Sequence, residues 1–107
     1  MNIDFFKKYF LDLHKLSNSV NDNDLKHFTE LLITSNNNGG KIIIFGNGGS
    51  SSIASHVSID LNKAAGIESL NFNDPTLITC FANDYGYENW VSEVVKIHCK
   101  PKDVVIF

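Results

Sequence analysis

One stretch constrains the fold more than any other: residues 41–63, KIIIFGNGGSSSIASHVSIDLNK, run from an apolar strand through a glycine-rich turn into a helix. Residues 41–45 are mostly β-branched and aromatic, which is typical of a strand buried on both faces. The glycines of residues 46–49 permit tight turning and a close approach of the backbone to a ligand. Residues 50–52 are serines, and any of them can cap the helix that we predict over residues 53–63. Because free N–H groups and the positive end of the helix dipole meet at this turn, the stretch predicts a site for phosphate or a phosphosugar.

The same predicted helix carries His56 and Asp60, which are four residues apart and therefore project from one face. An imidazole and a carboxylate at this spacing can share a metal ion or work as an acid/base pair. The alternative is an ordinary polar stripe on a solvated helix, and the spacing alone favours that interpretation. The functional interpretation gains weight from position, since the pair follows the predicted phosphate loop by only a few turns.

Composition limits the class of protein. The chain has 107 residues, enough for one small domain, and its 43% hydrophobic and 20% charged residues indicate a globular core and not disorder. A formal net charge of −3 argues against nucleic acid as a direct partner. The cysteines, Cys80 and Cys99, match no metal or redox spacing, so we expect buried thiols in a reducing compartment. The charged N-terminus reads as neither a signal peptide nor a membrane span, which predicts a cytoplasmic protein with no membrane partner.

The rest of the chain predicts alternating helices and strands. Apolar residues at three- and four-residue steps predict leading helices over residues 3–17 and 22–37. After the organising stretch we expect a strand over residues 67–72 and a helix over residues 76–82, which Asp74 caps with Pro75 at the first position. A loop at residues 83–87, a second helix over residues 88–99 and a last strand over residues 104–107 should follow. This order is typical of the α/β class with a parallel sheet.

The last predicted strand is unusually apolar for its place in the chain. Residues 104–107, VVIF, should form a central strand with neighbours on both sides, yet they are the last residues of the sequence. Ligands of doubly wound folds bind beyond the carboxyl ends of the strands, so the loop after this strand should be functional. We therefore expect residues 1–107 to be a single but incomplete domain.

Two segments, FGNGGSSSIASHVSIDL and FANDYGYENW, resemble the sedoheptulose 7-phosphate isomerase (phosphoheptose isomerase) family of the sugar isomerase (SIS) domain fold. The resemblance covers nearly the whole chain and corresponds to the N-terminal half of such an enzyme. It implies a doubly wound, flavodoxin-like parallel sheet with two leading helices. It also implies a homotetramer with active sites shared between subunits.

The resemblance implies roles for individual residues. It implies substrate contacts from the glycine turn and from a downstream Asn-Asp pair, at Asn47, Gly48, Gly49, Ser50, Asn83 and Asp84. His56 matches a histidine that is a zinc ligand in metal-containing members, and Asp60 stands where the family has a glutamate that serves as catalytic base and metal ligand. Asp60 is one methylene shorter than that glutamate. Without the resemblance, Asn83-Asp84 reads more readily as a turn followed by a helix cap.

The leading functional hypothesis is a phosphosugar isomerase that converts sedoheptulose 7-phosphate to a heptose 7-phosphate through an enediol, for the heptose of lipopolysaccharide or capsule. The chain lacks the family's second, serine/threonine-rich phosphate loop and its late histidine, the proposed general acid. One alternative is a non-catalytic SIS module that binds a phosphosugar or a protein partner, and another is a fragment without activity.

Overall fold

The computed structural model describes residues 3–107, and two compact units divide the chain after Glu30. The first unit contains α1 (Ile3–Asn18) and the beginning of α2 (Asp22–Asn37), which confirms both predicted leading helices. The large side chains of α1 are exposed to solvent: Phe5, Phe6, Tyr9, Phe10, Leu11, Leu13 and Leu16. None of the helices in the described part of the chain has the length and hydropathy needed to cross a membrane.

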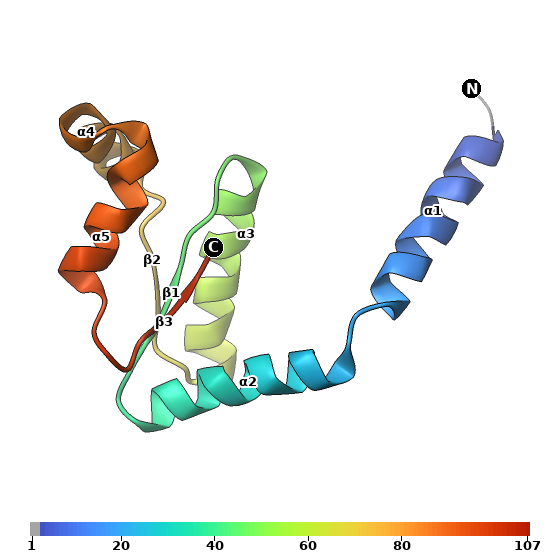
Figure 1. Ribbon diagram of the computed structural model, residues 1–107, viewed down its shortest axis with the longest axis horizontal. Helices are drawn as coiled ribbons and strands as arrows, with labels where there is room; N and C mark the ends of the chain where they lie inside the picture. The colour runs from blue at the N-terminus through green and yellow to red at the C-terminus, as the bar shows by residue number, and fades with distance from the viewer. Residues whose placement is uncertain (1–2) are drawn as a thin grey trace. The chain divides into compact units, whose positions relative to one another are not determined.

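The second unit, residues 31–107, is built on a three-stranded parallel sheet (Figure 1). Its strands are β1 (Ile42–Ile44), β2 (Ser69–Asn71) and β3 (Val104–Ile106), in the order β2-β1-β3. β1 is therefore central and fully buried, whereas β3 lies at an edge of the described sheet and is half-buried. The expectation that residues 104–107 are a central strand is thus not met within the described chain. The parallel α/β class is confirmed.

Helices cover both faces of the sheet. Alternate residues of β1 point to opposite faces and pack against different helices. Ile42 and Ile44 pack with Leu32 of α2 and with Ala54. On the other face Ile43 and Phe45 pack with side chains of α4 and α5, chiefly Leu77, Ile78, Phe81, Trp90 and Val94. Figure 1 shows the corresponding layers, with α3 on one side of the strands and α4 and α5 on the other. This is the doubly wound arrangement that the family resemblance implied.

α3 (Gly49–Asp60) begins earlier than predicted and continues into a π-helical turn, η1 (Leu61–Ala65). Its N-cap is Gly48, and no side chain caps it. The prediction of a serine cap was therefore wrong. Gly48 has φ 57° and ψ −126°, a conformation that glycine adopts easily, and this turns the chain into the helix before the serines are reached.

The helices of the opposite face are α4 (Pro75–Tyr85) and α5 (Trp90–His98), joined by the short 3₁₀ helix η2 (Tyr87–Asn89). Asp74 Oδ1 accepts hydrogen bonds from the amides of Thr76 and Leu77, at 2.9 and 3.1 Å, so the predicted cap is confirmed. The predicted loop at residues 83–87 was wrong, because α4 continues to Tyr85 and Gly86, with φ 88°, ends it.

The cysteines differ from the prediction. Cys80 lies on α4 with an exposed side chain, and Cys99 is only half-buried at the end of α5. Neither is therefore a fully buried thiol.

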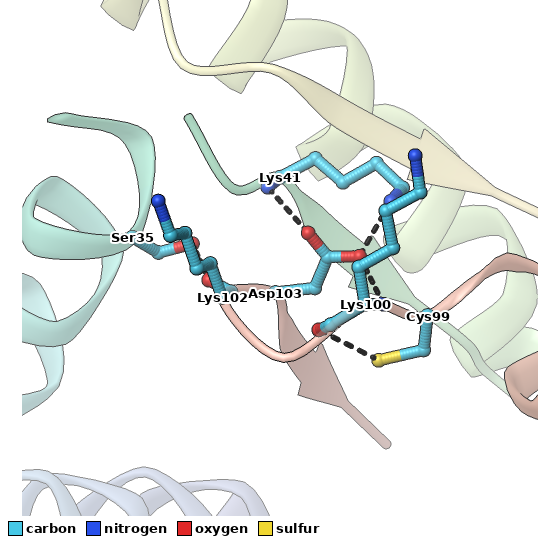
Figure 2. Close-up of polar contacts among 6 residues, drawn as sticks. All are labelled: Ser35, Lys41, Cys99, Lys100, Lys102 and Asp103. Carbon is cyan, nitrogen blue, oxygen red and sulfur yellow. Dashed lines mark hydrogen bonds and ion pairs between the residues drawn. The ribbon is translucent and has the colours of Figure 1, made fainter. Parts of the chain in front are cut away.

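The amino ends of β1 and β3 are tied together by Asp103 (Figure 2). Its carboxylate, 2% exposed, accepts hydrogen bonds from the amide of Lys41, the amide of Lys100 and the ammonium group of Lys41. Burial raises the pKa of Asp103, but the hydrogen bonds from Lys41 and Lys100 and the charge of Lys41 outweigh it, so the pKa lies below its ordinary 3.8. Next to it, the Ser35 hydroxyl donates to the carbonyl oxygen of Lys102 at 2.7 Å. This end of the sheet is held by polar contacts, which leaves the carboxyl ends free for a site.

Candidate functional site

A cavity of about 390 Å³ lies at the carboxyl ends of β1 and β3. It is lined by residues that follow these strands and by residues of η2 and α5, namely Phe45, Gly46, Asn47, Ser50, Tyr87, Glu88, Trp90, Val91 and Phe107. β2 and β3 pair with opposite edges of β1, so the order of the strands reverses at β1. The cavity lies at this switch point. Open α/β sheets bind their ligands at such a position.

The turn that enters the cavity requires glycine at two places for different reasons. A Cβ atom on Gly46 would lie 2.3 Å from the carbonyl oxygen of Ser50, so no side chain fits there. Gly48 has open space around it but a φ of +57°, which L side chains rarely adopt. The sequence-predicted glycine turn therefore lies at the end of β1, held close against the start of α3.

The backbone amides of this turn divide into paired and unpaired groups. The Gly46 amide donates to Asn73 Oδ1 at 3.0 Å, and the Asn47 amide donates to the Ser50 hydroxyl at 2.7 Å. Within residues 3–107, no protein acceptor pairs with the amide of Gly48 or Gly49. Two adjacent free N–H groups at the start of a 12-residue helix are the arrangement that binds an anion.

Two asparagines hold the end of β1 in place. Asn71 donates from its side-chain amide to the carbonyl oxygen of Ile44 at 2.7 Å, and Asn73 bonds both the amide and the carbonyl oxygen of Gly46. Ser55 of α3 donates to Asn71 Oδ1 at 3.0 Å. We did not predict these contacts, although two polar residues at the end of a strand next to a glycine turn are a usable signal for them.

The aromatic and acidic wall of the cavity was also missed. The Tyr87 hydroxyl donates to Asn47 Oδ1 at 2.9 Å, across 40 positions of sequence. Glu88 supplies the carboxylate of the lining. Trp90 is buried against Phe45 with ring centroids 5.6 Å apart, and it also lines the cavity.

His56 and Asp60 lie on one face of α3, as their spacing predicted. His56 Nε2 is 3.4 Å from Asp60 Oδ2, and the ammonium nitrogen of Lys63 is 3.2 Å from Asp60 Oδ1. Their side chains are 74% and 51% exposed, so neither is buried, and neither lines the cavity.

A zinc ion needs more donors than this pair offers. A stable site usually has about three or four protein ligands, and residues 3–107 contain no group of three His, Cys, Asp or Glu side chains placed to hold a metal ion. Asp60 also already meets the cation of Lys63. Among residues 3–107, His56 and Asp60 therefore lack the further side-chain ligands that a zinc site usually has.

Asn83 and Asp84 lie in the last turn of α4 and not in a loop. The Asn83 side-chain amide donates to Asp84 Oδ1 at 3.0 Å, and the Cys80 thiol is 3.9 Å from Asp84 Oδ2. Both residues are exposed and lie outside the cavity lining. Of the substrate contacts that the resemblance implied, Asn47 and Ser50 line the cavity, whereas Gly48, Gly49, Asn83 and Asp84 are not part of its lining.

Comparison with known proteins agrees with this architecture. Residues 5–107 match the family model of the SIS domain. The fold is similar to that of phosphoheptose isomerase GmhA from Neisseria gonorrhoeae, with a TM-score of 0.84 and 22% sequence identity over 96% of this chain and 56% of that chain. The chain therefore spans just over half the length of this relative, and no curated protein matches it. Because the family model covers nearly the whole sequence, the chain belongs to the SIS domain family.

Proposed function

We propose that this chain is the phosphosugar-binding part of an isomerase that interconverts sedoheptulose 7-phosphate and a heptose 7-phosphate. The observation that carries the proposal is the pair of free amides at Gly48 and Gly49, in a turn whose flanking residues Asn47 and Ser50 line a cavity at the switch point of the sheet. The similarity in fold to a phosphoheptose isomerase supports it.

The charges of the cavity suggest how such a ligand would lie. Lys and Arg are absent from the cavity lining in the described chain, so the amides of the glycine turn are the groups that would meet a phosphate. Glu88 would repel the phosphate and instead accept hydrogen bonds from sugar hydroxyl groups. The phosphate would therefore sit at residues 48–50 and the sugar would extend toward Asn47 and Glu88. The apolar rings of Phe45, Trp90 and Phe107 would exclude water from one side.

The reaction needs more groups than the cavity contains. An aldose–ketose isomerisation moves a proton between C1 and C2, so it needs a base for the carbon and a second group that protonates the oxygen. On the family resemblance, we propose Asp60 as the base, with His56 as its partner in a zinc site. Asn83 and Asp84 would contact the sugar. These four residues lie outside the described cavity, so they would join the site only together with further groups. We propose that those groups come from other subunits of a homo-oligomer or from the length that the isomerase relative has in addition.

The cellular role follows from the substrate class. The product would supply the heptose of lipopolysaccharide or capsule, and the sugar phosphates of that pathway would place the protein in the cytoplasm. The domain as a whole, residues 1–107, would then act as one incomplete SIS domain.

A second candidate function is a non-catalytic SIS module that binds a phosphosugar or a protein partner. The observation in its favour is that Asp60 already pairs with His56 and Lys63 on an exposed helix face. A free base would not have both carboxylate oxygens so occupied.

Trp90 permits a direct test, because it is the chain's sole tryptophan and it lines the cavity. We expect its fluorescence to change saturably with sedoheptulose 7-phosphate and much less with unphosphorylated sedoheptulose. Inorganic phosphate should compete. Equal responses to the two sugars, or none to either, would contradict phosphate anchoring at this turn.

A further inference from the structure

A hydrogen bond joins the side chains of Tyr87 and Asn47, which line the cavity from two different elements. Its two ends are held by different elements. Asn47 follows β1 and is fixed by the contacts of Gly46 and Ser50, whereas Tyr87 begins η2, whose next residue after Asn89 is the buried Trp90. The bond therefore joins two well-anchored backbones, which gives it a defined geometry.

The direction of this bond decides what Asn47 can offer a ligand. The Tyr87 hydroxyl donates to Asn47 Oδ1 at 2.9 Å, so the carbonyl side of the amide is already engaged. In the described chain the NH₂ side has no protein partner. An asparagine whose oxygen is engaged presents donors, and donors recognise oxygen atoms of a sugar or a phosphate.

We propose that Tyr87 is a positioning residue that orients the side-chain amide of Asn47 so that its NH₂ group donates to an oxygen atom of the bound phosphosugar. The inference rests on the proposed function for the identity of the ligand, but not for the orientation of the amide. Without the Tyr87 hydroxyl, the side-chain amide of Asn47 would rotate freely between its two orientations. Ligand binding would then have to order this amide, which lowers the affinity. Tyr87 therefore acts through Asn47 and need not touch the ligand.

The chain contains a matched control two residues away. Tyr85 is a tyrosine of similar exposure, 52% against 55% for Tyr87, and its ring packs against Phe81. No hydrogen-bond partner meets its hydroxyl among residues 3–107. Tyr85→Phe and Tyr87→Phe thus remove the same atom from neighbouring sites, and only the second removes a contact with Asn47.

The binding experiment compares these variants by titration of Trp90 fluorescence with sedoheptulose 7-phosphate. Y87F should weaken binding about two- to tenfold, the range expected for one hydrogen bond, and Y85F should leave the affinity unchanged. In an Asn47→Ala background Y87F should have no further effect. Equal affinities of Y87F and wild type, or an undiminished loss in the N47A background, would overturn the proposal.

A second measurement needs no ligand and keeps the two proposals apart. In ¹⁵N relaxation measurements of the Asn47 side-chain NH₂ group, wild type and Y85F should show an ordered amide and Y87F a mobile one. Because the bond is exposed to water, the unfolding free energies of Y85F and Y87F should agree, which a purely structural role would not predict. If wild type binds no phosphosugar, the proposed function fails, yet an amide that is equally ordered in Y87F would still overturn the role of Tyr87.

Discussion

Single residues set the shape of the turn after β1. Gly46 is required by space, since any Cβ would meet the backbone of Ser50, and Gly48 is required by its positive φ. Asn73, in the loop after β2, then fixes Gly46 by hydrogen bonds with both the amide and the carbonyl oxygen of that glycine. The free amides of the turn are therefore positioned before any ligand arrives.

Substituting alanine for Gly46 should destabilise the protein. The new methyl group would lie 2.3 Å from the Ser50 carbonyl oxygen, and the backbone would have to move to accept it. We expect a loss of about 1–3 kcal/mol in the free energy of unfolding, measured by urea denaturation. Gly49→Ala is the control, because nothing lies within 4 Å of the added Cβ. Equal stabilities of the two variants would show that the turn is not packed as described.

Asp103 makes a pH-dependent contribution to stability. Because its pKa is lower in the folded chain than the ordinary value of 3.8, its contribution is fully present above that value and is lost as the pH falls through the folded pKa. Asp103→Asn should lower the free energy of unfolding by about 1.5–3 kcal/mol near pH 7. The uncharged amide cannot replace the hydrogen bonds that the charged carboxylate accepts from Lys41 and Lys100.

The comparison of Asp103→Asn with wild type across pH checks the sign of this effect. The difference in unfolding free energy should shrink as the pH is lowered below about 4. Asp12→Asn, which removes the exposed partner of Lys8, is the control and should change stability little at any pH. A cost for D103N that stays constant down to the lowest pH would contradict the lowered pKa.

At the scale of elements, local patterns predicted what depends on local sequence. The amphipathic periods of α1 and α2 and the apolar run of β1 gave these elements closely, and the glycine turn was predicted in its place. The end of α4 was missed because Gly86 alone ends that helix, and Asn83 and Asp84 do not break it. The cap of α3 was missed because a glycine conformation replaces the side-chain cap.

The rest of the site was beyond reach of local patterns for a physical reason. The contacts of Asn73 with Gly46 span 27 positions, and that of Tyr87 with Asn47 spans 40. Such pairs arise from the parallel pairing of strands and the return of the chain across the sheet. Spacing of His56 and Asp60 correctly placed them on one face, but it does not reveal that this face lies outside the cavity lining.

One face of α3 should bind zinc only weakly. His56 and Asp60 are two donors where about three or four are usual, and Lys63 competes for the carboxylate. Calorimetric titration of the 107-residue chain with zinc should therefore show no stoichiometric, tight phase. His56→Ala is the matched variant and should change the titration little. A tight 1:1 complex that H56A abolishes would contradict this expectation.

At the scale of the whole molecule, the proposed function makes the chain one part of an isomerase-type site. It spans 56% of the similar isomerase chain, and the cavity lining contains no histidine or lysine that would serve as an acid within the described residues. The loss of a general acid commonly costs a factor of about 10² to 10⁴ in rate.

We therefore expect no detectable isomerisation of sedoheptulose 7-phosphate by residues 1–107 alone. NMR spectra of the sugar, recorded with and without added zinc, measure this. The buffer with zinc alone is the control. Conversion well above the rate of the buffer would show that an acid is supplied from within these residues. His14, His27 and His98 would then be the first side chains to substitute.

The most direct test of the site is a two-dimensional NMR map of the backbone amides during titration with sedoheptulose 7-phosphate. We expect the largest shifts at Gly48 and Gly49, smaller ones at the cavity residues Asn47, Ser50 and Glu88, and none along α1. Unphosphorylated sedoheptulose should leave Gly48 and Gly49 unshifted. Shifts confined to the face of His56 and Asp60, with the amides of Gly48 and Gly49 unchanged, would contradict a phosphate site at the glycine turn.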